Sequence, residues 1–225
     1  MRTALAVLAI AVSAFGSLIV GSGGLTVTAQ DPGPEMLHPR LGVRTVASGL
    51  TQPTTMAFIG PSDVLVLEKA SGQVKRVTGG VVGPTVLDLA VNFGSERGLL
   101  GIALHPDFPA DPGVYLYWTE SLTGADTNDL AATPLLGNRV DRFVWNGATL
   151  TMDQNLIRIR AIQEDAGQPA RGNHDGGVMA FGPDEKLYIY MLVSNTIVDR
   201  AVKAALDNKR NFNEKREITK LLEGI

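Results

Sequence analysis

Short apolar runs alternate with polar turns from Gly42 onward. The runs are rich in Val, Ile, Leu and aromatic residues, and Gly, Pro, Asp or Asn stand between them, which is typical of β-strands joined by tight turns. No convincing helical period occurs between Leu41 and Gly137. The pattern predicts strands at Thr55–Ile59, Val64–Glu68, Val74–Thr78, Gly101–Leu104, Val114–Thr119, Asn138–Trp145, Val178–Phe181 and Leu187–Tyr190.

One local pattern recurs along this region. An apolar run, a proline turn with an aspartate and a second apolar run follow one another at Met56–Asp63, Ile102–Asp107 and Met179–Asp184. Proline presets the turn and aspartate accepts hydrogen bonds from its amides. Repeated meander units of this kind predict a β-propeller. At about 40 to 50 residues per blade, residues 42–191 suffice for about three four-stranded blades, so we expect an all-β, partial propeller.

The N-terminus has a different character. Arg2 is followed by an uncharged stretch that runs to Gln30 and ends in small residues, as in a secretory signal. We expect residues 1–29 to be a signal peptide cleaved after Ala29, or else an anchor in which residues 4–20 cross a membrane. A linker, 30–41, follows. Either alternative places the rest of the chain in the periplasm or outside the cell, and mass spectrometry of exported material would show a start near Gln30.

The composition changes again at Leu192. Residues 192–225 contain no proline, one glycine and many charges, and apolar residues recur there at helical spacing, at Val198, Ala201, Val202, Ala205 and Leu206. This pattern predicts a helical C-terminal tail of unrelated composition. A frame change, a fusion or a misassembled gene would account for it.

Composition excludes several functions. The formal net charge of −3 gives no reason to expect nucleic-acid binding. The absence of cysteine removes thiol chemistry, disulfides and cysteine-based zinc sites. The chain has no nucleophile elbow, phosphate loop, dinucleotide fingerprint or zinc-protease motif. Candidate chemistry therefore falls on the three histidines, His38, His105 and His174.

His174 stands apart from the other two. Glycines at 172, 176 and 177 surround it, and glycine lets the backbone approach a ligand closely. Asp175 adds a neighbouring acid. The alternative is a turn histidine bonded to a nearby carbonyl, and the residues by themselves leave both interpretations open.

Four stretches in order carry a resemblance to a known family. They are GLTQPTTMAFIGPSDVLVLEKASGQVKRV, SERGLLGIALHPDFPADPGVYLYWTES, NRVDRFVW and GNHDGGVMAFGPDEKLYI. Over roughly residues 42–189 the chain resembles the PQQ-dependent soluble sugar dehydrogenases, the glucose/sorbosone dehydrogenase family. The resemblance implies a six-bladed propeller that holds pyrroloquinoline quinone (PQQ) over its central channel, with calcium bridging cofactor and protein.

The resemblance also implies roles for particular residues. Members oxidise an aldose by transferring a hydride to the quinone while a histidine removes the hydroxyl proton, and that histidine corresponds to His174. Glu96 occupies a position where some members carry a cofactor-contacting amide. Asn173 replaces an aspartate of some members and is the weaker candidate for cofactor binding. No metal ligand is assigned in this chain.

The resemblance predicts a truncated enzyme. In the family, later blades supply the arginines and lysine that bind the cofactor's carboxylates, and the calcium ligands. We therefore expect this chain to contain the proton-abstracting histidine but to lack most of the cofactor site, and to show no activity alone. The expected partners are a sugar and an electron acceptor, a membrane only through an uncleaved N-terminus, and further copies of the chain through open blade edges. The alternatives are a non-catalytic extracellular binding module and a misassembled gene fragment.

Overall fold

The computed structural model describes residues 7–9, 35–163, 169–191 and 218–219. The chain divides into two units, Met1–Leu50 and Thr51–Ile225. In the first unit, β1 (Val7–Ala9) pairs in parallel with β2 (Val43–Thr45). The second unit contains the candidate site.

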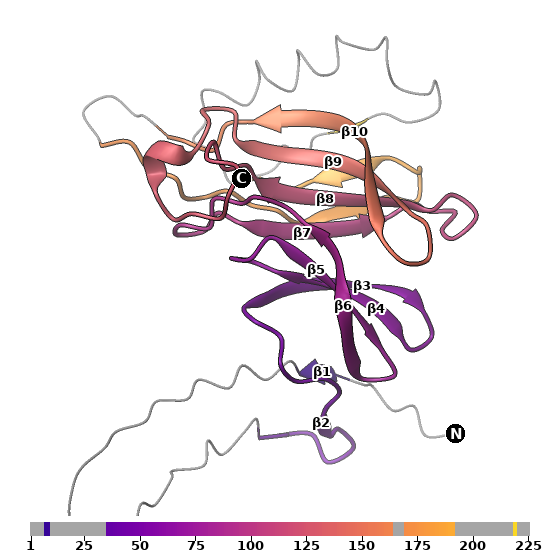
Figure 1. The fold of residues 1–225 in the computed structure, drawn as a ribbon. Coiled ribbons are helices and arrows are strands. Elements are labelled where there is room, and N and C mark those ends of the chain that lie inside the picture. Colours follow the sequence, from indigo (N-terminus) through magenta and orange to yellow (C-terminus); the bar gives the residue numbers. More distant parts are fainter. Residues whose placement is uncertain (1–6, 10–34, 164–168, 192–217, 220–225) are drawn as a thin grey trace, which may run out of the picture. The chain divides into compact units, whose positions relative to one another are not determined.

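Two four-stranded antiparallel sheets follow one another in the second unit (Figure 1). In each sheet the chain passes to the neighbouring strand at every turn, which makes both sheets simple meanders. The first comprises β3 (Pro53–Gly60), β4 (Asp63–Glu68), β5 (Gln73–Thr78) and β6 (Val81–Asp88). The second comprises β7 (Leu99–Leu104), β8 (Gly113–Thr119), β9 (Asn138–Trp145) and β10 (Leu150–Ile159).

A third, smaller sheet contains β11 (Met179–Phe181), β12 (Leu187–Ile189) and β13 (Ile218–Thr219). The first two strands are antiparallel, and β13 lies parallel to β12. A short 3-10 helix, η1 (Leu130–Ala132), interrupts the loop between β8 and β9. Asp129 caps this helix by accepting a hydrogen bond from the backbone N–H of Ala131.

The all-β prediction is confirmed, and each of the eight predicted strands exists, Asn138–Trp145 with the predicted bounds and the others with shifted ends. Two strands of the four-stranded sheets, β6 and β10, were missed, as was the short β2; β6 and β10 lie at the edges of their sheets and are partly exposed. Gly83 and Pro84 interrupt β6, and β10 is rich in polar residues. Because an edge strand needs few apolar side chains, neither segment carries the strand pattern.

The predicted signal or anchor segment and the predicted tail fall outside the described residues, apart from β1 and β13. At Ile218–Thr219 the structure has a strand in place of the expected helix, because this pair extends the edge of β12. Among the described residues, no helix is long and apolar enough to cross a membrane.

The central part of the second sheet is buried on both faces, and every residue of β8 is buried. The even-numbered side chains of β8, with Val114 and Leu116 among them, join Leu65 and Leu67 of the first sheet in one apolar core. Tyr115 and Tyr117 of β8 face the opposite way, into a second core, which consists of Ala103, Tyr115, Tyr117, Val140, Ile157, Ile159, Met179 and Leu187. A strand covered on two sides has no solvent-facing positions, which explains the uninterrupted run VYLYW.

An ion-paired cluster lies within the second sheet. The Asp141 side chain is fully buried, forms an ion pair with Arg139 at 3.0 Å and accepts hydrogen bonds from Trp118 Nε1 at 2.7 Å and Asn155 Nδ2 at 2.5 Å. The Arg139 guanidinium lies 4.8 Å from the Trp118 ring centroid and also pairs with Glu120 at 2.7 Å. The Asp141 carboxylate thus has three side-chain partners, although Arg139 Nε, which lies in ion-pair range, makes no hydrogen bond.

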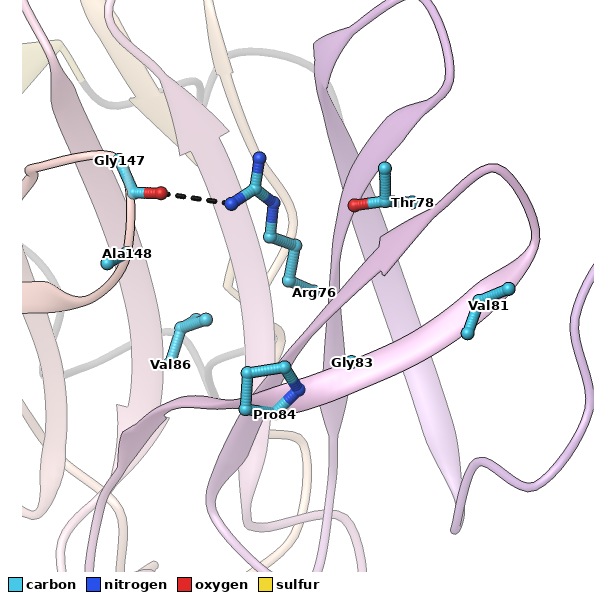
Figure 2. A pocket seen from close by; sticks show the side chains of 8 residues that line it. All are labelled: Arg76, Thr78, Val81, Gly83, Pro84, Val86, Gly147 and Ala148. Carbon is cyan, nitrogen blue, oxygen red and sulfur yellow. Dashed lines mark hydrogen bonds between the residues drawn. The ribbon is translucent and has the colours of Figure 1, made fainter.

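A hollow of about 310 Å³ lies between the β5–β6 hairpin and the turn after β9, and Figure 2 shows the residues that line it. Arg76 lies at its margin. Its guanidinium donates to both Asp63 carboxylate oxygens, at 2.9 and 2.5 Å, and to the Gly147 carbonyl at 2.9 Å. These bonds already engage Arg76, and most of the remaining lining is apolar. The hollow is therefore a packing gap beside the hydrogen bonds by which Arg76 links the two sheets.

Candidate functional site

The structure brings two of the predicted site residues together. His174 lies in the loop that leads into β11, and its backbone N–H donates to Glu96 Oε2 at 2.5 Å across 78 residues of sequence. Both side chains are exposed. His174 has a φ of 59°, in the left-handed region that residues other than glycine adopt uncommonly. The loop therefore presents its imidazole from a constrained backbone.

The glycines beside His174 allow the protein to pack against itself. A Cβ on Gly172 would lie 1.7 Å from Arg97 Nη1, and one on Gly177 would lie 2.6 Å from the Leu100 side chain. Gly177 also has a φ of 116°, a conformation that favours glycine. These two positions thus let the loop approach the segment 97–100 closely.

Arg97 holds the loop from within the protein. It is 3% exposed and donates from Nη1 to the Gly172 carbonyl at 2.5 Å and from Nε to Asn92 Oδ1 at 2.8 Å. Burial lowers the pKa of Arg97, and the nearby Asp175 charge opposes that shift. A guanidinium retains its charge at any physiological pH, so a buried cation lies beneath the loop.

Lys69 fixes the opposite turn, the one that carries Glu96. Its Nζ donates to the carbonyls of Phe93 and Ser95 at 2.9 and 2.8 Å. Burial lowers the pKa of Lys69, the charge of Arg97 lowers it further, and Asp175 opposes both effects. Ser95 itself has a φ of 53°, so both turns contain a left-handed residue other than glycine.

Asp175 is the buried acid of the site. It is 2% exposed; its Oδ1 accepts from Asn138 Nδ2 at 2.9 Å, and its backbone carbonyl accepts from the Tyr117 hydroxyl at 2.5 Å. Its Oδ2 is buried and has no hydrogen-bond partner. Burial raises the pKa of Asp175, against the lowering effects of the Asn138 hydrogen bond and the Arg97 charge.

Replacing Asp175 with asparagine should therefore change how stability depends on pH. A carboxyl with a raised folded-state pKa binds its proton more tightly in the folded than in the unfolded chain, so its stabilisation is complete below the unfolded pKa of about 4 and is lost as pH rises through the folded value. We expect the free energy of unfolding of the parent chain to fall relative to Asp175→Asn above about pH 4. Urea unfolding at several pH values measures this. The exposed Asp88→Asn is the control, and parallel curves for parent and Asp175→Asn would contradict the expectation.

Asn173 accepts a hydrogen bond through its backbone. Its carbonyl accepts from Gln163 Nε2 at 2.7 Å, whereas its side-chain Oδ1 is buried and has no hydrogen-bond partner. The structure therefore places Asn173 beside His174, with its carboxamide oxygen turned away from solvent. Its predicted contact with a cofactor stays a prediction.

The described residues do not account for a whole cofactor site. PQQ carries carboxylates, which require cations, but Lys69 and Arg97 donate to backbone carbonyls and Arg97 is buried. Glu96, the exposed neighbour of His174, is itself anionic. In the part of the chain that the structure describes, no three His, Asp or Glu residues gather as metal ligands. The described residues thus offer an exposed imidazole and do not by themselves fit PQQ or calcium.

Comparison with known proteins assigns the family. The model of the Glucose / Sorbosone dehydrogenase family matches residues 50–205, which is more than half of the chain, and the chain belongs to this family. A curated relative, quinoprotein glucose dehydrogenase B of Acinetobacter calcoaceticus, is 26% identical over 151 residues, which cover 64% of this chain and 29% of the relative.

Two solved structures are also similar. The PQQ-bound form of aldose sugar dehydrogenase from Streptomyces coelicolor is 32% identical, with a TM-score of 0.48 over 68% of this chain and 41% of that one. A glucose dehydrogenase is 24% identical, with a TM-score of 0.51 over 66% of this chain and 40% of that one; it supports the fold. The chain thus spans well under half the length of each.

Sequence reasoning missed the supporting groups of the site. Arg97, Lys69, Tyr117 and Asn138 come from four separate segments, and each contacts the 172–175 loop or the Glu96 turn. Arg97 had the only available signal, its place next to Glu96 in the quoted SERGLLG stretch. The others look like ordinary strand and turn residues.

Proposed function

We propose that this chain contributes the general base of an exported, PQQ-dependent sugar dehydrogenase, with His174 as that base. Family membership supports the reaction class. The observation that carries the residue assignment is the exposed His174 on a left-handed backbone fixed by Glu96. The bound cofactor would supply the two-electron acceptor, and an aldose hydroxyl would be the proton donor.

The chain's own contribution is to hold and receive a proton. A hydroxyl carbon that loses a hydride also loses its hydroxyl proton, and a positioned imidazole is the side chain most often used to take such a proton. The His174 backbone is fixed by Glu96, and Arg97 holds the carbonyl of Gly172 two residues earlier. The loop therefore loses little freedom when a substrate binds, which favours proton transfer.

The two four-stranded sheets are proposed to be successive propeller blades, with β11 and β12 as the inner strands of a third. The meander order within each sheet and the apolar cores on both faces of the second sheet support this arrangement. Calcium, which the family resemblance implies, would then bind to residues other than those that the structure describes.

We propose that the 225-residue chain alone does not oxidise sugars. The two cations near His174 are committed to backbone carbonyls, and a base has no effect without an electron acceptor. A dye-reduction assay with aldoses, PQQ and calcium should give no signal above a protein-free blank. Turnover by the purified chain would overturn this part of the proposal and show that the site is complete.

Export and self-association belong to the same proposal. The uncharged run behind Arg2 supports export. Phe58 on the edge strand β3 and Val178 beside β11 are 58% and 68% exposed, and exposed apolar edges favour association. Sedimentation of the purified chain should show oligomers, and a stable monomer at micromolar concentration would contradict that expectation.

A further inference from the structure

The Glu96 carboxylate faces the backbone of His174. Its Oε2 accepts the His174 N–H at 2.5 Å, in a loop whose residue 174 has a φ of 59°. A left-handed residue other than glycine persists only where its surroundings hold it. The backbone N–H of an exposed loop residue would otherwise bond to water and leave that conformation without support.

Glu96 is itself well anchored. Lys69 Nζ donates to the carbonyl of Ser95, the residue before Glu96, at 2.8 Å. Arg97, the residue after it, donates to the Gly172 carbonyl at 2.5 Å and is 3% exposed. The two turns are thus joined at two points, through Glu96 to residue 174 and through Arg97 to residue 172. A carboxylate anchored in this way can hold the left-handed backbone of His174 in place.

We propose that Glu96 is a positioning residue, which holds the left-handed backbone of His174 and so presents the imidazole. Its importance for catalysis rests on the proposed function of His174, whereas its effect on the loop does not. This role requires an acceptor oxygen but does not depend on the negative charge of Glu96. Glu96→Gln should therefore preserve it, and Glu96→Ala should abolish it.

Hydrogen–deuterium exchange of the full chain, followed by mass spectrometry, tests this directly. We expect Glu96→Ala to raise early uptake by about one deuterium in the peptide that contains His174, because one amide loses its acceptor. Glu96→Gln and the exposed control Glu35→Ala should match the parent. No change in Glu96→Ala would overturn the proposal, and so would an equal rise in Glu96→Gln, since charge would then be the cause.

Peptides from the buried strand β8 report unfolding of the whole unit in the same experiment. Should Glu96→Ala expose them too, we would compare it with the double variant E96A/H174G, because glycine adopts the left-handed conformation without support. Recovery of protection in the β8 peptides of the double variant supports the proposal, and persistent exposure of these peptides overturns it. The measurement needs no turnover, so a positive result would stand even if His174 proved not to be a base.

Discussion

Asp141→Ala is expected to lower the free energy of unfolding by about 3–5 kcal/mol, because breaking a buried ion pair is costly and the change leaves only the partly exposed Glu120, at 2.7 Å, to balance the Arg139 charge. Arg139 is 8% exposed and would lose the carboxylate at 3.0 Å. The indole N–H of Trp118, which donates to Asp141 at 2.7 Å, would lose its acceptor as well. Since domains are commonly stable by only about 5–15 kcal/mol, we expect a large drop in the urea midpoint.

Asp153→Ala is the matched control for this experiment. Asp153 also pairs with an arginine of β9, Arg142, which like Arg139 keeps a second carboxylate partner, Asp111 at 2.7 Å, but the Asp153 side chain is 43% exposed. An exposed pair is worth about 0–1 kcal/mol. Equal losses for the two variants would show that the Asp141 cluster contributes no more to stability than a surface ion pair.

The buried strands were predictable from sequence because burial leaves a direct pattern. A strand covered on both faces, such as β8, must be apolar throughout, and the run VYLYW shows it. The edge strands β6 and β10 face solvent along much of their length and were missed. A local pattern does not show which sheets pack together or which side chains meet in the cluster around Asp141, because both depend on contacts between segments that are distant in sequence.

The site was predictable only in part for the same reason. Glycines and a resemblance singled out His174, and the resemblance added Glu96. The contact between them spans 78 residues and runs through a backbone N–H, so the side-chain types gave no indication of it. The resemblance suggested a cofactor contact for Glu96, whereas the structure gives its carboxylate a bond within the protein.

Replacing His174 should have the largest effect on catalysis. The test places residues 172–190 of this chain in a complete relative and changes His174 to glutamine, which keeps polarity and approximate size but cannot accept a proton at neutral pH. A general base contributes about 10²–10⁴-fold to rate, so turnover should fall by at least about 100-fold. The contact seen at this position runs through the backbone N–H of residue 174, and the substitution leaves that donor unchanged.

Val178→Ala in the same transplanted segment is the control. Val178 is 68% exposed and lies four residues beyond the base, so its truncation should leave turnover near that of the parent chimera. Cofactor binding should also be similar in all three proteins, because His174 is assigned to the proton and not to retention of the cofactor. This comparison separates a catalytic loss from a general disturbance of the loop.

The ratio of turnover between the parent chimera and its His174→Gln variant, both saturated with cofactor, tests the central claim most directly. The account predicts a ratio of at least about 100, as expected for a general base, with cofactor affinity unchanged. A ratio below about threefold, far under the general-base range, would show that His174 is a turn residue and that the reaction takes its base from elsewhere.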